Sequence, residues 1–190
     1  MKTTKLNSIQ ILFGALLLIY SCGTPTEKTE EPKQPSTEEQ VKRGEYLVGI
    51  MGCNDCHSPK IFGPEGPYPD PNLLLSGHPA SMPIAKFDTT MIGPWVLFNP
   101  HNTVAVGPWG VTYAANLTSD ATGIGNWTPE QFKKAIKEGK YKGMDGARML
   151  LPPMPWPNYK NITDEDASAI FEYLKSTKPV ENVVPAPVIK

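Results

Sequence analysis

Apolar positions recur at the period of a one-sided helix in three separate stretches of the chain. The first runs from about Thr37 to Met51 and opens with a capping box, either Ser36 with Glu39 or Thr37 with Gln40. Its apolar or small positions lie three and four residues apart: Val41, Gly44, Leu47, Val48 and Met51. This spacing predicts a helix that buries one face.

Two more helices are predicted in the second half of the chain. One begins after Thr128, has Pro129 at its first position and stops at Gly139. The other begins near Thr163, carries acidic residues in its first turn and ends before Pro179. Their buried stripes are Phe132, Ala135 and Ile136 in the former and Ala167, Ile170, Phe171 and Leu174 in the latter. We therefore expect an all-α core of three helices.

Residues 58–126 lack this helical period, and proline recurs ten times among them. Val104, Val106, Val111 and Tyr113 suggest short extended pieces around the turn residues 107–110. The whole chain has 21 Pro and 16 Gly, a share well above the usual ~12%. This composition predicts one domain, residues 40–190, with a long Pro/Gly-rich loop insertion.

The N-terminus has the composition of an export signal. Lys2 and Lys5 precede a largely apolar run over 9–19, which is shorter than the ~20 residues of a membrane span. The run ends in Ser21-Cys22-Gly23, which resembles a bacterial lipoprotein processing box. The resemblance implies that residues 1–21 are a signal peptide and that Cys22 is acylated. The domain would then be lipid-anchored on the periplasmic or cell-surface side of a bacterial membrane.

Residues 22–39 read as a flexible tether behind that anchor. The segment 23–39 contains no large apolar residue and holds five Glu against two Lys. A flexible chain of this length spans about 20–25 Å. The whole chain has 18 Lys and Arg against 19 Asp and Glu, a formal net charge of −1. Nucleic-acid binding is therefore excluded as a function, because it requires a basic excess.

The sequence Cys53-Asn54-Asp55-Cys56-His57 is a C-x-x-C-H motif, the attachment sequence of c-type haem. The two thiols can add to the two vinyl groups of one haem, and His57 is placed to bind the iron. A zinc site would need further Cys or His pairs, and no Cys follows Cys56. A thioredoxin-like pair would follow a strand, whereas a helix is predicted here.

The chain has a C-x-x-C-H motif just after its first predicted helix and two further predicted helices later in the sequence. This arrangement resembles class I cytochrome c. The resemblance implies a fold of three core helices around one haem, in which the first and last helices cross where a small residue meets an aromatic one. Gly44 facing Ile170 and Tyr173 would match this crossing. It also implies that a methionine late in the chain binds the iron opposite His57.

Met154 is the best candidate for this second axial ligand. It lies in Leu150-Leu151-Pro152-Pro153-Met154-Pro155-Trp156-Pro157, where four prolines stiffen the loop. Met149 and Met144 lie nearby in a Gly-containing stretch and are the fallback. Met51 lies on the first helix, adjacent to the motif, and cannot reach the far face of the haem, and Met82 and Met91 lie in the insertion. His78 and His101 remain alternative ligands that would lower the reduction potential.

Several short segments resemble the cytochrome subunits that serve membrane-bound dehydrogenases. They are Asn116-Leu117-Thr118, Thr122-Gly123-Ile124-Gly125-Asn126-Trp127 and Pro157-Asn158-Tyr159. Aromatic side chains near them are candidates to line the haem or to bind its propionates, namely Trp109, Trp127, Trp156 and Tyr159, together with Arg148. The resemblance also implies that a proline carbonyl after the motif holds the His57 proton, at Pro59, Pro64, Pro67 or Pro69.

These features together predict a non-enzymatic electron carrier with one covalent haem c and His57/Met154 ligation of its iron. It would relay electrons between redox partner proteins, with a dehydrogenase upstream and an oxidase or reductase downstream. The alternative is a haem enzyme or gas-binding sensor with an open distal position, for which His78 or His101 could act as acid or base. A third possibility is a dedicated structural subunit of one dehydrogenase.

Overall fold

The computed structural model describes residues 35–189. The predicted signal peptide, Cys22 and the tether up to residue 34 lie outside the described residues. Helix α1 (Thr37–Ile50) begins within the range 22–39 that the sequence assigned to the tether. None of the helices over 35–189 is both long enough and apolar enough to cross a bilayer.

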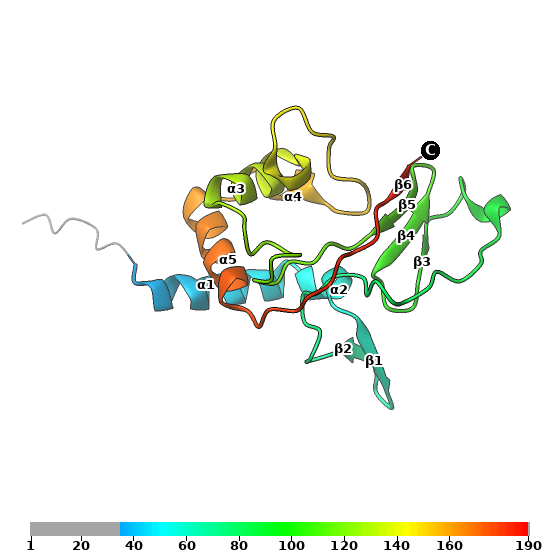
Figure 1. The fold of residues 1–190 in the computed structure, drawn as a ribbon, viewed down its shortest axis with the longest axis horizontal. Helices are drawn as coiled ribbons and strands as arrows, with labels where there is room; N and C mark the ends of the chain where they lie inside the picture. Colours follow the sequence, from blue (N-terminus) through cyan, green and yellow to red (C-terminus); the bar gives the residue numbers. More distant parts are fainter. Residues whose placement is uncertain (1–34, 190) are drawn as a thin grey trace, which may run out of the picture. The chain divides into compact units, whose positions relative to one another are not determined.

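The three predicted helices are confirmed to within a residue or two at each end. They are α1, α3 (Pro129–Glu138) and α5 (Asp164–Ser176), and α1 packs against α5 while α3 covers α5 (Figure 1). Two short helices add to them, α2 (Cys53–His57) after α1 and α4 (Trp156–Tyr159) before α5. Single 3-10 turns form η1 (Thr89–Met91) and η2 (Tyr141–Gly143).

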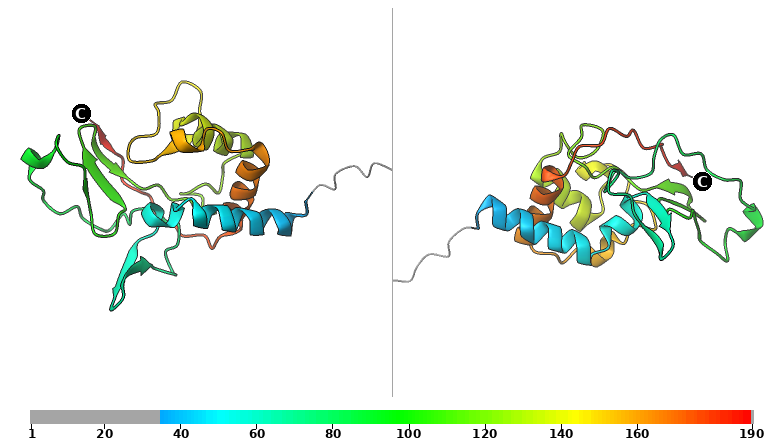
Figure 2. Two further views of the ribbon diagram at one scale, coloured as in Figure 1. Left: turned by 180° about the vertical axis from the view of Figure 1, so that it is seen from behind. Right: turned by 90° about the horizontal axis from the view of Figure 1, so that it is seen from below.

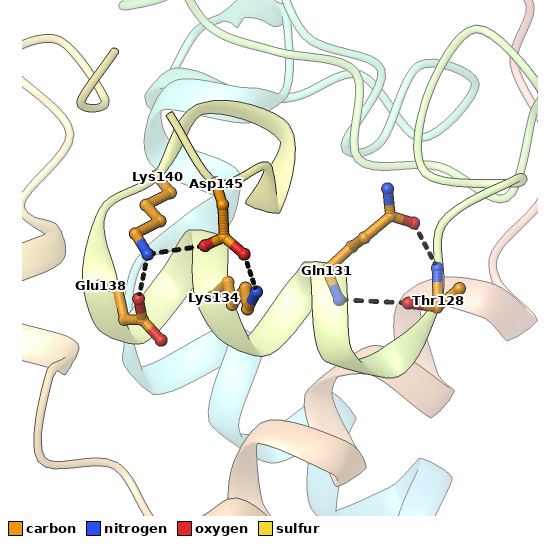
Figure 3. Close-up of polar contacts among 6 residues, drawn as sticks. All are labelled: Thr128, Gln131, Lys134, Glu138, Lys140 and Asp145. Atoms are coloured by element: carbon orange, nitrogen blue, oxygen red, sulfur yellow. Dashed lines mark hydrogen bonds and ion pairs between the residues drawn. The ribbon is translucent and has the colours of Figure 1, made fainter. Parts of the chain in front are cut away.

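The helix ends form as the sequence predicts, because polar side chains satisfy the first free backbone N–H groups. Ser36 and Glu39 form the capping box of α1, which selects this pair over Thr37 with Gln40. Thr128 and Gln131 cap α3 in the same reciprocal way (Figure 3). Thr163 caps α5 by accepting from the backbone of Asp166. These caps fix where each amphipathic face begins.

The core lies where α1, α3 and α5 meet. Its buried members are Leu47, Val48, Leu75, Ile124, Phe132, Ile136, Ile170, Phe171 and Leu174. Gly44 lies at the closest approach of α1 and α5, since a Cβ there would meet the Ala169 carbonyl oxygen at 2.0 Å and the Tyr173 Cβ at 2.7 Å. The predicted crossing with Tyr173 is thus confirmed, and the backbone of Ala169, rather than Ile170, is the nearest neighbour.

The prediction of an all-α fold is not confirmed, because the insertion forms two sheets. Strands β1 (Lys60–Gly63) and β2 (Gly66–Pro69) make an antiparallel hairpin. A four-stranded antiparallel sheet has the order β3-β4-β5-β6, with bounds Leu97–Phe98, Val104–Gly107, Gly110–Tyr113 and Val188–Ile189. Within the described chain this sheet lies beyond α2, on the side away from α5 (Figures 1 and 2).

The sheet forms because β-branched residues flank a tight turn, as the sequence indicated for 104–113. Val104 and Val106 are buried on β4, which pairs with β5 through Val106 opposite Val111. The segment after α5 runs back along the domain and adds β6 at the edge, with Val188 opposite Val111. The C-terminal residues therefore complete the sheet. No local sequence pattern in these residues predicted a strand.

Candidate functional site

Helix α2 consists of the C-x-x-C-H motif itself. Gly52 turns the chain between α1 and α2, and Cys53 and Cys56 then lie three residues apart on one helix face. Both are free thiols, and Cys53 packs against the helical core. Burial raises the pKa of Cys53 to about 11 and raises that of Cys56 as well. Neutral, partly buried thiols differ from the exposed low-pKa thiolate of a redox-active pair.

The His57 ring is held by one hydrogen bond from its Nδ1, which lies 2.7 Å from the backbone carbonyl oxygen of Ala115. A carbonyl only accepts, so this contact places the proton on Nδ1 and leaves a lone pair on Nε2. Within residues 35–189, Nε2 has no hydrogen-bond partner. Burial also lowers the pKa of His57, which favours the neutral ring that binds metals.

The acceptor for His57 is not one of the four prolines considered from the sequence. The carbonyl of Pro59 instead accepts from the backbone of Asp70 at 2.8 Å, which closes the base of the β1–β2 hairpin. Pro64, Pro67 and Pro69 lie in that hairpin. Because the insertion folds into strands, a residue 58 positions after His57 returns to its ring, and sequence spacing gave no sign of this.

The Ala115 carbonyl is itself fixed by a short hydrogen-bond network. The neighbouring Ala114 donates to Thr103 at 2.9 Å and accepts from the backbone of His78 at 2.9 Å. Gly77 donates its backbone N–H to the His57 carbonyl at 2.8 Å and packs against the Ala114–Ala115 peptide. The insertion thus builds the support for His57.

Lys60 closes the C-terminal end of α2. Its ammonium donates to the carbonyls of Asn54 and Asp55 at 3.0 Å each and to that of Ser58 at 2.5 Å. These are the free carbonyls that a helix leaves at its last turn, where a cation is favourable. Lys60 was not among the residues predicted for the site, although a lysine just after a short helix is a recognisable C-terminal signal.

Met154 lies in the segment between α3 and α4, as the sequence predicted. Of the three late methionines, Met144 and Met149 are 46% and 45% exposed, whereas Met154 is partly buried. The stretch before Met154 folds back on α3, since Leu150 donates to the Gly139 carbonyl at 2.6 Å. The hydroxyl of Thr112 on β5 donates to the Pro152 carbonyl at 2.8 Å.

Ion pairs tie the start of this segment to α3. Asp145 lies 2.6 Å from the Lys134 ammonium and 2.9 Å from that of Lys140, which also pairs with Glu138 at 2.8 Å (Figure 3). Hydrogen bonds from both lysines lower the pKa of Asp145 to about 2. These groups are at the surface, where such pairs contribute little to stability. They orient the loop more than they stabilise the fold.

The other side chains named from the sequence have mostly structural contacts. Trp127 and Tyr159 pack against the core, and the Tyr159 hydroxyl donates to the Met51 carbonyl at 3.2 Å. Trp156 packs on Gly139. The Arg148 guanidinium stacks on the Tyr141 ring, 3.9 Å from its centre.

Within residues 35–189, Trp109 has an unsatisfied polar atom, whereas His78 and His101 are hydrogen-bonded. The Trp109 indole Nε1 is the one buried side-chain nitrogen or oxygen without a hydrogen-bond partner in the described part of the chain. His78 is 1% exposed, and its ring nitrogens lie 2.9 Å from the Thr103 hydroxyl and 3.1 Å from the Met82 carbonyl. His101 accepts from the backbone of Lys60 at 3.1 Å.

This set of residues fits a covalently held haem. Two free thiols and an imidazole with an open Nε2 lie on one short helix, and a thioether lies in a loop held nearby by β5. The unsatisfied N–H of Trp109 also suits a haem, because a propionate would supply the acceptor that the protein lacks. The thiols and the imidazole lie on helix α2, and Thr112, which holds the Met154 loop, lies on strand β5.

Comparison with known proteins shows similarity to subunits of several dehydrogenases. The chain is 41% identical over 94% of its length to one of the nicotinate dehydrogenase subunits of Pseudomonas putida, covering 12% of that protein. It is 40% identical over 92% of its length to the cytochrome c subunit of the quinone alcohol dehydrogenase of Gluconacetobacter polyoxogenes, covering 29% of it. Similarity to the fructose dehydrogenase cytochrome subunit of Gluconobacter japonicus is 29% over 87% of this chain and 27% of that subunit.

The chain therefore spans less than a third of each of these relatives. The model of the family described as "Cytochrome c" matches residues 41–178, from the first turn of α1 to just beyond α5. This match includes the motif, the insertion and the Met154 loop. The chain belongs to the cytochrome c family, whose members carry covalently bound haem c with its iron.

Proposed function

We propose that this protein is a monohaem electron carrier. Cys53 and Cys56 would form the thioether links, and His57 and Met154 would be the axial ligands. The observation that carries this proposal is the His57 ring, which is held through Nδ1 by Ala115 and keeps Nε2 free. When bound, haem c supplies a one-electron Fe(III)/Fe(II) couple.

The residues of the chain have three tasks in this proposal. The Ala115 carbonyl orients the His57 ring and makes it a stronger electron donor, as such outer contacts do for metal-bound histidines. A thioether from Met154 opposes this by raising the reduction potential relative to a second histidine. With His57 and Met154 both holding the iron, the protein would leave no site on the metal for oxygen or a substrate.

An open-site haem enzyme or gas sensor is less well supported. Such a protein would need a free acid or base beside the distal position. Both ring nitrogens of His78 are engaged, and one nitrogen of His101 accepts from the backbone of Lys60. These contacts hold the two histidines within the insertion and favour the carrier.

The relatives suggest which partners the carrier serves. Their names associate them with dehydrogenases of fructose, nicotinate, gluconate or alcohols. We propose that this chain accepts electrons from a dehydrogenase and passes them to an oxidase or reductase, either as a free carrier or as a subunit of one such complex.

We also propose a lipid anchor at Cys22, on the strength of the processing box in the sequence. The carrier would then face the periplasm or the cell surface. We expect Cys22→Ser to move the haem protein from the membrane fraction to the soluble fraction, while haem content stays unchanged. Haem protein that remains in the membrane fraction after this change would contradict the anchor.

The assignment of Met154 is tested by the spectrum of the oxidised protein. We expect a far-red sulfur-to-iron charge-transfer band in the wild type, its loss in Met154→Ala, and a lower reduction potential in that variant. The matched control is Met149→Ala, which removes an exposed methionine from the same segment and should keep the band. If the band persists in Met154→Ala, the ligand is Met144 or Met149, and if the wild type lacks the band, the ligand is His78 or His101.

The attachment itself has a separate readout in the same preparation. The denatured polypeptide should keep its colour, and the peptide that contains Cys53 and Cys56 should carry the mass of one haem. A colourless polypeptide would overturn the proposed function as a whole.

A further inference from the structure

Residues 151–153, just before Met154, accept one hydrogen bond from outside their own loop. Met154 donates its backbone N–H to Leu151 at 3.3 Å, which is a local turn. The contact from elsewhere is the hydrogen bond from the Thr112 hydroxyl to the Pro152 carbonyl, at 2.8 Å. In the described structure no other hydrogen bond joins residues 151–154 to another element.

Thr112 is well placed to fix that loop, because it sits in the middle of an ordered strand. It is 7% exposed and pairs across the sheet with Ala105, whose carbonyl lies 3.3 Å from the same hydroxyl. A hydroxyl has one proton, and the shorter contact to Pro152 is the better hydrogen bond. The prolines stiffen the loop, whereas Thr112 sets where the stiff loop sits.

The same strand continues into the support for the other axial residue. Ala115 follows Thr112 by three positions, and its carbonyl accepts from His57. Between them, Ala114 is fixed in both directions by hydrogen bonds to Thr103 and His78. Figures 1 and 2 show the loop between α3 and α4 coming down to the end of the sheet that contains β5.

We propose that Thr112 is a positioning residue for the axial sulfur, and that residues 112–115 form one support shared by His57 and Met154. This inference rests on the proposed function, since it takes Met154 as the ligand. It gives the insertion a task, because β5 holds the two ligand-bearing segments, α2 and the Met154 loop, at a fixed separation. A ligand held in place in advance loses less freedom on binding.

The test replaces the hydroxyl and keeps the shape of the side chain. Thr112→Val removes the donor and leaves the Pro152 carbonyl without it, whereas Thr112→Ser restores a hydroxyl. Thr118→Val is the matched control, because Thr118 is also a buried threonine and its hydroxyl donates to the Asn116 side chain at 2.8 Å instead of to the loop. All three are made in the full-length holoprotein.

The readout is competition for the axial position by added imidazole, followed through loss of the far-red band in the oxidised protein. We expect Thr112→Val to lower the imidazole concentration needed for half-loss by about tenfold, which corresponds to about 1.4 kcal/mol. Thr112→Ser should return towards the wild-type value. Thr118→Val should leave the concentration unchanged, even where it lowers the denaturant midpoint of the fold.

The outcomes separate this inference from the proposal beneath it. A wild-type band that disappears in Met154→Ala, with equal imidazole sensitivity in Thr112→Val and the wild type, would overturn the role of Thr112 alone. Equal sensitisation by Thr112→Val and Thr118→Val would reduce Thr112 to a general stabiliser of the fold and also overturn its role. A wild type without the band would refute Met154 as the ligand, and this inference with it.

Discussion

Gly44→Ala is expected to lower the free energy of unfolding by about 2–3 kcal/mol, because it forces apart α1 and α5, two of the three helices that build the core. The added Cβ would lie 2.0 Å from the Ala169 carbonyl oxygen and 2.6 Å from its carbon, and both belong to the backbone of α5. A helix backbone cannot move aside as a flexible side chain can. The separation of α1 from α5 would loosen the packing of Leu47 and Val48 against Ile170.

The higher helix propensity of alanine opposes this loss. The sign of the change in stability therefore shows whether crowding or helix propensity dominates at Gly44. Alanine favours a helix over glycine by about 1 kcal/mol, so a residue free of neighbours would gain from the change. Gly49 is such a residue in the same helix, since a Cβ there meets nothing within 4 Å. Denaturant unfolding of the holoproteins should show Gly49→Ala at or above wild-type stability and Gly44→Ala well below it. Equal midpoints for the two variants would refute the close crossing.

The helices could be predicted from the sequence because their signals are local. The capping residues Ser36, Thr128 and Thr163 lie within three positions of the backbone groups they satisfy. The apolar stripes then repeat at a period that only one secondary structure explains. The motif at 53–57 is equally local, so the thiols and His57 could be named without a structure.

The support around His57 could not be predicted, because its partners are distant in sequence and chemically ordinary. The acceptor on His57 is a backbone carbonyl of an alanine, a group that every residue carries. Thr112 is one of several threonines in the chain, and its partner Pro152 lies 40 positions away. The edge strand β6 pairs only through its backbone with β5. Only the folded insertion brings these groups together.

The insertion therefore contributes contacts to the candidate site. From the sequence alone, residues 58–126 are a proline-rich insertion between the motif and α3. In the structure the segment supplies Lys60 at the end of α2, Ala115 at the His57 ring and Thr112 at the Met154 loop. A deletion that joined the motif directly to α3 would remove all three contacts at once.

Gly77→Ala is expected to disturb the support of His57. Gly77 has φ +77°, where a Cβ is strained, and its Cβ would also lie 2.5 Å from the Ala114 oxygen and 2.6–2.7 Å from the Ala115 carbonyl. The strain costs about 1–2 kcal/mol and the crowding about 1–3 kcal/mol. Unlike Gly44, Gly77 packs against the Ala114–Ala115 peptide, and the Ala115 carbonyl accepts the hydrogen bond from His57 Nδ1.

The two costs can be separated with Gly146→Ala, the matched control. Gly146 has φ +78°, and a Cβ there meets nothing within 4 Å, so this variant carries the backbone strain without the crowding. In denaturant unfolding of the holoproteins, Gly77→Ala should therefore be less stable than Gly146→Ala by the crowding alone. The reduction potential should rise in Gly77→Ala, because a displaced Ala115 carbonyl makes His57 a weaker donor, and should not change in Gly146→Ala. Equal stability and equal potentials in the two variants would show that the Ala115 carbonyl is not held where the structure has it.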